Sequence, residues 1–190
     1  MRSWSGLPSM PCLSELKPLL RISLNDDAYL RQVQPSDITE AYVNGLNDPL
    51  VNRFLGRSRE RLQTPETVRT YVEENFKNPN DVLFGMFIDG GLRGTVRLHD
   101  VREDTRVGTI GVLIFDTSYW QKGWGRRAIA AIVKFARREL GIQTFKAGMV
   151  AQNTPSRNTF ACLGFRHFPE RDTTDSQGTT IEYWQLDTNN

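Results

Sequence analysis

The sequence is poor in the residues that support several classes of protein. Its 190 residues include two cysteines and two histidines. Cys12 lies in a proline-containing start and Cys162 in an apolar stretch, a usage that argues against a disulfide framework and favours a reducing setting. We expect a cytoplasmic protein without a metal cofactor, and we expect Cys162 to be a buried, inert thiol.

Long apolar runs and an excess of one charge are also missing. No run reaches about 18 apolar residues, and Pro8, Pro11 and Pro18 interrupt the first 20 residues, so neither a membrane span nor a signal peptide is readable. The 24 Lys plus Arg against 22 Asp plus Glu leave a net charge of +2, too balanced for bulk nucleic acid or an anionic membrane as partner. We expect a monomer or homodimer in which any anion site is local.

The material that is present suits one folded domain. Apolar residues make up 38% of the chain and charged residues 24%, which is enough to offset the chain entropy lost on folding. The length is that of a single domain. Residues 1–26 are rich in Ser, Pro and Leu and are interpreted as an N-terminal extension, and residues 27–190 as the domain.

Hydrophobic periodicity predicts the order of the elements. Strands are expected at residues 28–33, 82–88, 92–98, 107–115, 144–150, 165–168 and 181–186, and helices at 38–46, 65–76, 126–140 and 155–163. Ser36 and Thr64 are the expected N-caps of the first two helices, and Gly141 is placed to stop the third. This order predicts a mixed α/β (α+β) fold, with a mostly antiparallel sheet and helices on both faces.

Two glycines open the long helix directly after a strand. Without Cβ atoms, Gly123 and Gly125 let the backbone approach a ligand, and the free N–H groups of a helix start favour a phosphate. A tight turn is the simpler interpretation of the same glycines. They also satisfy the dinucleotide fingerprint, but residues 145–147 are Phe, Lys and Ala where an acidic residue for the ribose belongs. A nicotinamide-binding site is therefore the weaker alternative.

A second segment lies one strand beyond the long helix. Asn153 is followed by Thr, Pro and Ser156, and the segment ends on Leu, Gly164 and Phe165. A strand end before a proline would explain an isolated Asn. Its spacing to the Gly-Phe ending, together with the glycine-rich helix start, resembles the GNAT superfamily of N-acetyltransferases.

The resemblance covers residues 27–187, and its opening is similar to the ribosomal-protein and amino-sugar acetyltransferase subgroup. It implies a GNAT-like fold that takes acetyl-CoA as co-substrate. The implied diphosphate cradle consists of Gln121, Lys122, Gly123, Trp124, Gly125 and Arg126, the implied pantetheine contacts are Leu113, Ile114 and Phe115, and Asn153 and Ser156 match the positions that hold the rest of the coenzyme arm. Trp120 departs from the pattern, because many members carry Arg or Gln there.

The sequence does not assign catalytic residues. Removing a proton from the amine requires a base, for which the weak candidates are His99, Asp100, Glu103 and Asp104; the last two also fit a solvated charge cluster. The family often places a Tyr acid on the helix after the Asn, but this chain has Phe160. Tyr119, Tyr183 or water is left for that role, or the thiolate leaves unaided.

The resemblance implies an acetyl-CoA-dependent N-acetyltransferase that acts by direct attack of a primary amine on the thioester. The acceptor is expected to be a small molecule, such as an amino sugar, or a protein N-terminus. Its pocket is expected to include Asn47, Arg53, Phe54, Arg57 and Arg59 and the turn at 173–178. The alternatives are a non-catalytic acyl-CoA-binding domain and, with less support, a nicotinamide-dependent dehydrogenase.

Overall fold

A single twisted sheet forms the centre of the molecule in the computed structural model, which describes residues 13–16, 20–55, 61–176 and 178–188. Its strands are β1 (Arg21–Asn25), β2 (Ala28–Gln32), β3 (Val82–Ile88), β4 (Gly91–Arg102), β5 (Val107–Ile114), β6 (Thr144–Val150), β7 (Arg166–His167), β8 (Thr173–Thr174) and β9 (Thr180–Asp187). They follow the order β1-β2-β3-β4-β5-β6-β9-β7, and β8 pairs with β9. The predicted fold class is confirmed.

Neighbouring strands are antiparallel except β5 and β6, which run parallel. This topology excludes the nicotinamide alternative, because the dinucleotide fingerprint belongs to a parallel, doubly wound sheet.

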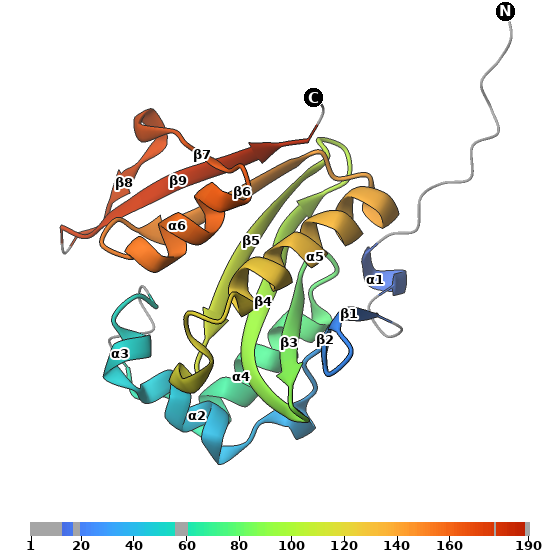
Figure 1. The fold of residues 1–190 in the computed structure, drawn as a ribbon, viewed down its shortest axis with the longest axis vertical. Coiled ribbons are helices and arrows are strands. Elements are labelled where there is room, and N and C mark those ends of the chain that lie inside the picture. The colour runs from blue at the N-terminus through green and yellow to red at the C-terminus, as the bar shows by residue number, and fades with distance from the viewer. Residues whose placement is uncertain (1–12, 17–19, 56–60, 177, 189–190) are drawn as a thin grey trace, which may run out of the picture.

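Helices cover both faces of the sheet. They are α1 (Leu13–Leu16), α2 (Glu40–Asn47), α3 (Pro49–Asn52), α4 (Pro65–Lys77), α5 (Trp124–Leu140) and α6 (Thr154–Cys162), with short 3-10 helices η2 (Pro35–Asp37), η4 (Thr117–Tyr119) and η5 (Pro169–Arg171). Figure 1 shows α5 and α6 on one face, with α4 behind the sheet. No helix among the described ranges is long and apolar enough to cross a membrane.

The sheet divides the buried side chains into two layers. Under α5, residues such as Ile129 and Ile132 join the core of the strands. On the other face, Tyr42 of α2 and Val68 and Val72 of α4 form a smaller cluster that includes Phe115, whose ring stacks on Tyr42 with centroids 4.6 Å apart. The end of β5 is thus fixed by α2.

The N-terminal segment contributes to the sheet, although the sequence suggested an extension without strands up to residue 26. β1 pairs antiparallel with β2, with Arg21 opposite Arg31, and Leu13 is buried in the layer under α5. Exposed and half-buried residues alternate along β1. Because β1 is an edge strand with no fully buried side chain, its apolar signal is weak.

Helix boundaries follow their capping residues, with one correction. Thr64 caps α4 through Thr67 N, and Gly141 ends α5 in the left-handed conformation, both as predicted. The first helix begins later than expected, because residues 35–37 form η2 and Thr39, not Ser36, accepts the N–H of Tyr42.

Candidate active site

The parallel pair β5–β6 separates part-way along its length. Its ladder ends at Thr109↔Lys146, although β5 remains paired with β4 as far as Ile114. β6 likewise remains paired with β9 as far as Val150. The strand edges beyond the ladder therefore face each other across an opening, which we call the gap, and Figure 1 shows the strands separating there.

The alternation of the backbone decides which groups of β5 point into the gap. Phe115 N donates to Arg93 O of β4 at 3.2 Å, so Leu113 and Phe115 direct their N–H groups to β4. The N–H groups of Val112 and Ile114 point the other way, toward β6. Among the three strand residues predicted for pantetheine, Ile114 is the one on the gap edge, and sequence reasoning missed Val112.

Trp120 has a structural role at the end of this edge. Its indole Nε1 donates to the carbonyl of Ile114 at 2.8 Å, and its ring packs against the cluster around Phe115. The Trp120 side chain, which departs from the family pattern, therefore donates a hydrogen bond to the last carbonyl of β5 that faces the gap. Because the indole N–H is used within the protein, the hydrogen-bond donors for an anion come mainly from the backbone of the following turn.

That turn presents backbone donors at the start of α5. Gln121 (φ 59°) and Gly123 (φ 79°) both have left-handed backbone conformations, and Gly123 is the N-cap of α5 without a side-chain cap hydrogen bond. The first N–H groups of the helix are therefore not satisfied by a capping side chain. Lys122 Nζ lies 5.1 Å from the centroid of the Tyr119 ring. Backbone donors and the charge of Lys122 thus meet at one helix start, an arrangement that favours an anion, and we call this turn the anion site.

Gly125 connects the turn to the gap. A Cβ built on Gly125 would lie 3.8 Å from Val112 Cγ2, 3.9 Å from Ile114 Cδ1 and 4.0 Å from Thr159 Cγ2 of α6. The missing side chain thus leaves space between β5, α5 and α6. The anion site and the gap edge are therefore contiguous.

Asn153 caps α6 on the far side of this space. Its Oδ1 accepts the N–H of Ser156 at 3.2 Å, as the end-of-strand interpretation requires. The amide nitrogen Nδ2 is the part of the side chain that can donate to a ligand. The cap fixes that amide at the turn between β6 and α6.

The opposite face of the sheet is open beside the gap. Alternate residues such as Ile110, Phe145 and Trp184 belong to the layer under α5, so their neighbours in sequence point to the other face. Register aligns His99, Thr109, Lys146 and Gln185 in one row across the four strands. Beyond the end of the β5–β6 ladder, Arg97 pairs with Gly111 on one side of the gap and Gly148 with Tyr183 on the other. A Cβ on Gly111 would meet no atom within 4 Å.

The candidate bases are separated by the structure. His99 lies half-buried on the open face, and its Nδ1 is 2.8 Å from Asp100 Oδ2. Glu103 and Asp104 are exposed in the turn between β4 and β5, beyond the closed end of the gap. His99 is therefore the candidate whose side chain lies on the open face.

The two tyrosine candidates have different partners. Tyr119 donates its hydroxyl to Asp89 Oδ2 at 2.9 Å, a contact that raises the pKa of the phenol and holds it at the β3–β4 hairpin. Tyr183 OH donates to Gln185 Oε1 at 3.1 Å and accepts from Arg171 Nη1 at 3.2 Å. Only Tyr183 of this pair belongs to the open face.

Two residues of α6, Phe160 and Cys162, were singled out from the sequence. Phe160 is buried and packs edge-on against Phe165 with centroids 4.9 Å apart, so it is a core residue. Cys162 is exposed, which corrects the expectation of a buried thiol. The apolar neighbours of Cys162 suggested burial, but among them Phe160 and Phe165 are buried while Ala161 is exposed like Cys162.

The structure describes some of the residues that were expected to line the acceptor pocket. Asn47 exchanges two 2.8 Å hydrogen bonds with the backbone of Gln63 and so closes the connection between α2 and α4. Arg53 lies over the ring of Phe54, 4.6 Å from its centroid. Arg57 and Arg59 lie outside the described residues.

Several solved structures with this architecture are described as acetyltransferases. A probable acetyltransferase superposes with a TM-score of 0.77 at 20% identity, covering 89% of this chain and 97% of the other. The ribosomal L7/L12 α-N-protein acetyltransferase in complex with coenzyme A gives 0.76 at 14% identity, over 88% and 98%. A GNAT acetyltransferase from Bacillus anthracis gives 0.73 at 20% identity, over 90% and 100%.

The sequence itself matches a family as well. No functionally curated protein matches the chain, but residues 28–166 match the model of the acetyltransferase (GNAT) domain. That match spans most of the chain, includes the glycine-rich start of α5 and the gap between β5 and β6, and agrees with the superpositions. The chain therefore belongs to the GNAT family of acetyltransferases.

Proposed function

We propose that the protein transfers the acetyl group of acetyl-CoA to a primary amine of a small molecule, such as an amino sugar, or of a protein N-terminus. The observation that carries the proposal is the contiguity of the anion site with the gap, through the space in front of Gly125. A diphosphate at the start of α5 and an extended arm along β5 fit this shape. Related folds that hold coenzyme A, or acetyl-CoA and AMP, support it.

The binding roles follow from the positions of the residues. Residues 121–126 hold the diphosphate through backbone N–H groups, with charge from Lys122 and Arg126. The pantetheine arm runs along the gap edge of Val112 and Ile114, and Asn153 and Ser156 hold it from α6. Trp120 has a structural role, because its indole N–H donates to the carbonyl of Ile114.

Acetyl transfer on this site needs few side chains. Gap-facing N–H groups such as that of Val112 are placed to stabilise the developing oxyanion, which is usually the largest catalytic contribution. The amine reaches the thioester through the opening beside Gly111 and Gly148. His99, held through Nδ1 by Asp100, takes up the proton of the amine at Nε2, through a water where needed.

The leaving thiolate has no dedicated donor at the family position, because Phe160 is a core residue. A thiol with a pKa of about 8.5 is acidic enough to leave at modest cost near neutral pH. The same substitution keeps a second function open, in which the protein binds acyl-CoA without catalysis.

Calorimetric titration tests the coenzyme site directly. We expect coenzyme A, and not NAD, to bind, and Gly125→Leu to weaken binding more than about tenfold because its side chain fills the space beside Val112. In the smaller variant Gly125→Ala the melting temperature should not fall, since the added Cβ makes ordinary contacts. Equal affinity in the Leu variant would refute the assigned site.

Thiol release from acetyl-CoA across a panel of primary amines separates catalysis from binding alone. An enzyme releases thiol with at least one amine above the rate of hydrolysis. Coenzyme binding with no release from any amine would favour the non-catalytic alternative.

A further inference from the structure

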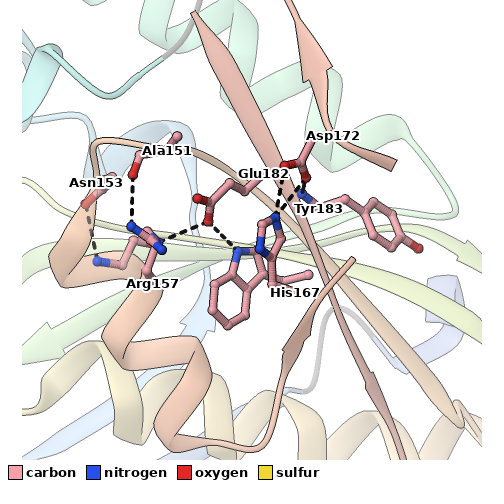
Figure 2. A network of polar contacts seen from close by, with 9 residues as sticks. Ala151, Asn153, Arg157, His167, Asp172, Glu182 and Tyr183 are labelled. Atoms are coloured by element: carbon pink, nitrogen blue, oxygen red, sulfur yellow. Dashed lines mark hydrogen bonds and ion pairs between the residues drawn. The ribbon is translucent and has the colours of Figure 1, made fainter. Parts of the chain in front are cut away.

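A buried carboxylate lies beneath α6, at the end of a polar network that Figure 2 shows. The side chain of Glu182 on β9 is 8% exposed. Its Oε2 accepts the indole N–H of Trp184 at 2.9 Å and lies 3.0 Å from Arg157 Nε of α6. An isolated charge at such a site is costly, and Arg157 supplies the opposite charge beside Glu182.

The carboxylate is held rigidly from the side of β9. The ring of His167 stacks on Trp184 with centroids 5.4 Å apart, and His167 Nε2 lies 3.0 Å from both carboxylate oxygens of Asp172. Asp172 also accepts the backbone N–H of Tyr183 at 2.9 Å. Trp184 is therefore fixed, and with it the oxygen of Glu182 that faces Arg157.

Arg157 contacts the turn that carries Asn153. Its Nη1 donates to the carbonyl of Ala151 at 3.5 Å, a long hydrogen bond, and its backbone N–H donates to Asn153 O at 3.0 Å. Ala151 is the first residue after β6, and Asn153 is the N-cap of α6. The guanidinium thus spans from the fixed carboxylate on β9 to the carbonyl of the turn.

Charge, not a directional hydrogen bond, joins the two side chains. Arg157 Nε is buried and finds no hydrogen-bond acceptor with suitable geometry among the described residues, although Glu182 Oε2 is 3.0 Å away. Within the described part of the chain, Arg157 is the one cation paired with Glu182. The carboxylate therefore sets where the guanidinium lies, and the guanidinium fork reaches the turn.

We infer that Arg157, oriented by Glu182, is a positioning residue for the coenzyme arm. It holds the turn between β6 and α6 so that the Asn153 amide lies beside the gap. The inference rests on the proposed coenzyme site. Its consequence is kinetic: loss of the contact to the turn raises the KM for acetyl-CoA and leaves kcat nearly unchanged, because Arg157 does not touch the reacting atoms.

Arg157→Lys separates positioning from folding. The ammonium keeps the charge opposite Glu182, but a compact point charge does not span from the carboxylate to the carbonyl of Ala151. We expect a melting temperature close to that of the wild type, a KM for acetyl-CoA raised about tenfold, and kcat within about twofold. The affinity for coenzyme A, measured by calorimetry, should fall in parallel.

A double variant separates loss of stability from loss of positioning. Arg157→Met alone leaves a buried carboxylate unpaired and is expected to lower the melting temperature. Combined with Glu182→Gln, it removes both charges and keeps an acceptor for Trp184. The double variant should regain melting temperature relative to Arg157→Met and keep the raised KM. Arg138→Ala, which breaks an exposed ion pair with Glu139 on α5, is the matched control and should leave KM unchanged.

The outcomes distinguish this inference from the proposed function. If the wild-type protein binds coenzyme A and both the Lys variant and the double variant keep its KM, Arg157 is purely structural and the inference is wrong. If the wild-type protein itself does not bind coenzyme A, the proposed site is wrong and the inference falls with it.

Discussion

Gly123 and Gly125 have different reasons to be glycine, although they stand two residues apart. Gly123 has φ 79°, a conformation that costs a side-chain-bearing residue roughly 1 kcal/mol. Gly125 lies inside α5 and its Cβ would make ordinary contacts. We expect Gly123→Ala to lower the free energy of unfolding by about 1 kcal/mol, and Gly125→Ala to leave it equal or raise it by up to about 1 kcal/mol. Urea titration measures both, and equal losses would contradict the assignment of Gly125 to the ligand space.

Local signals at single residues could be predicted from the sequence. Thr64 and Gly141 act on backbone groups within five residues of themselves, so their spacing to nearby residues is enough. The pairing of Arg157 with Glu182 joins positions far apart in the chain, and it depends on the register of β9 against β6. The sequence contains no local trace of that register, so this contact could not be predicted.

The element formed by η5, β8 and the start of β9 is held by Asp172. Its carboxylate accepts the N–H of Tyr183, which lowers its pKa, and the contact with His167 lowers it further. Because the folded pKa lies below the unfolded value of about 3.9, the carboxylate stabilises the fold above that pH. This stabilisation is lost as the pH falls toward the folded pKa.

Asp172→Asn should therefore lower the melting temperature at pH 7, and the difference from the wild type should shrink below about pH 4. Thermal melts at pH 7 and pH 3 measure it. Asp26→Asn, in an exposed turn between β1 and β2, serves as the control and should behave like the wild type at both values. A difference that persisted unchanged at pH 3 would show that the ionised carboxylate is not the cause.

Elements with a fully buried face were predictable, and edge elements were not. β3 is buried along its whole length and α5 has a continuous apolar stripe, so their ranges agree closely with the sequence pattern. β1 has no fully buried residue and was interpreted as part of an extension. The sequence predicts Ser36 as the N-cap of the helix at 38–46, but the ion pair of Asp37 with Arg31 and the hydrogen bond that Asp37 accepts from Gln34 N favour a tight 3-10 turn at 35–37.

At the scale of the whole molecule, cations lie on both faces of the gap. The coenzyme side carries the anion site at α5. The open face carries Lys146 and Arg171, which have no ion pair with a carboxylate among the described residues; Arg171 binds the neutral Gln185 and Tyr183 instead. The nearby carboxylate Asp187 accepts hydrogen bonds from the amide Nε2 of Gln185 and from the hydroxyl of Thr144, so it does not form an ion pair with Lys146 or Arg171.

An acceptor on this face should carry its own negative charge. Lys146 stands one row from Gly148, about 7 Å along the strand, so a phosphate or carboxylate at that distance from the reacting amine lies near the ammonium. If acetyl transfer occurs as proposed, kcat/KM for glucosamine 6-phosphate should exceed that for glucosamine about tenfold at low ionic strength and decline with added salt. Spermidine should be the poorest of the three acceptors.

Lys146→Gln tests which charge is responsible. The variant should reduce the preference for the phosphorylated amine while leaving the rate with glucosamine within about twofold, because only the charged part of the acceptor loses a partner. Lys134→Gln removes the same charge from α5, on the other face of the sheet, and should keep the preference. A wild-type enzyme that acetylated spermidine faster than the phosphorylated amine would refute the charge argument, because Lys146 would then not favour a negatively charged acceptor.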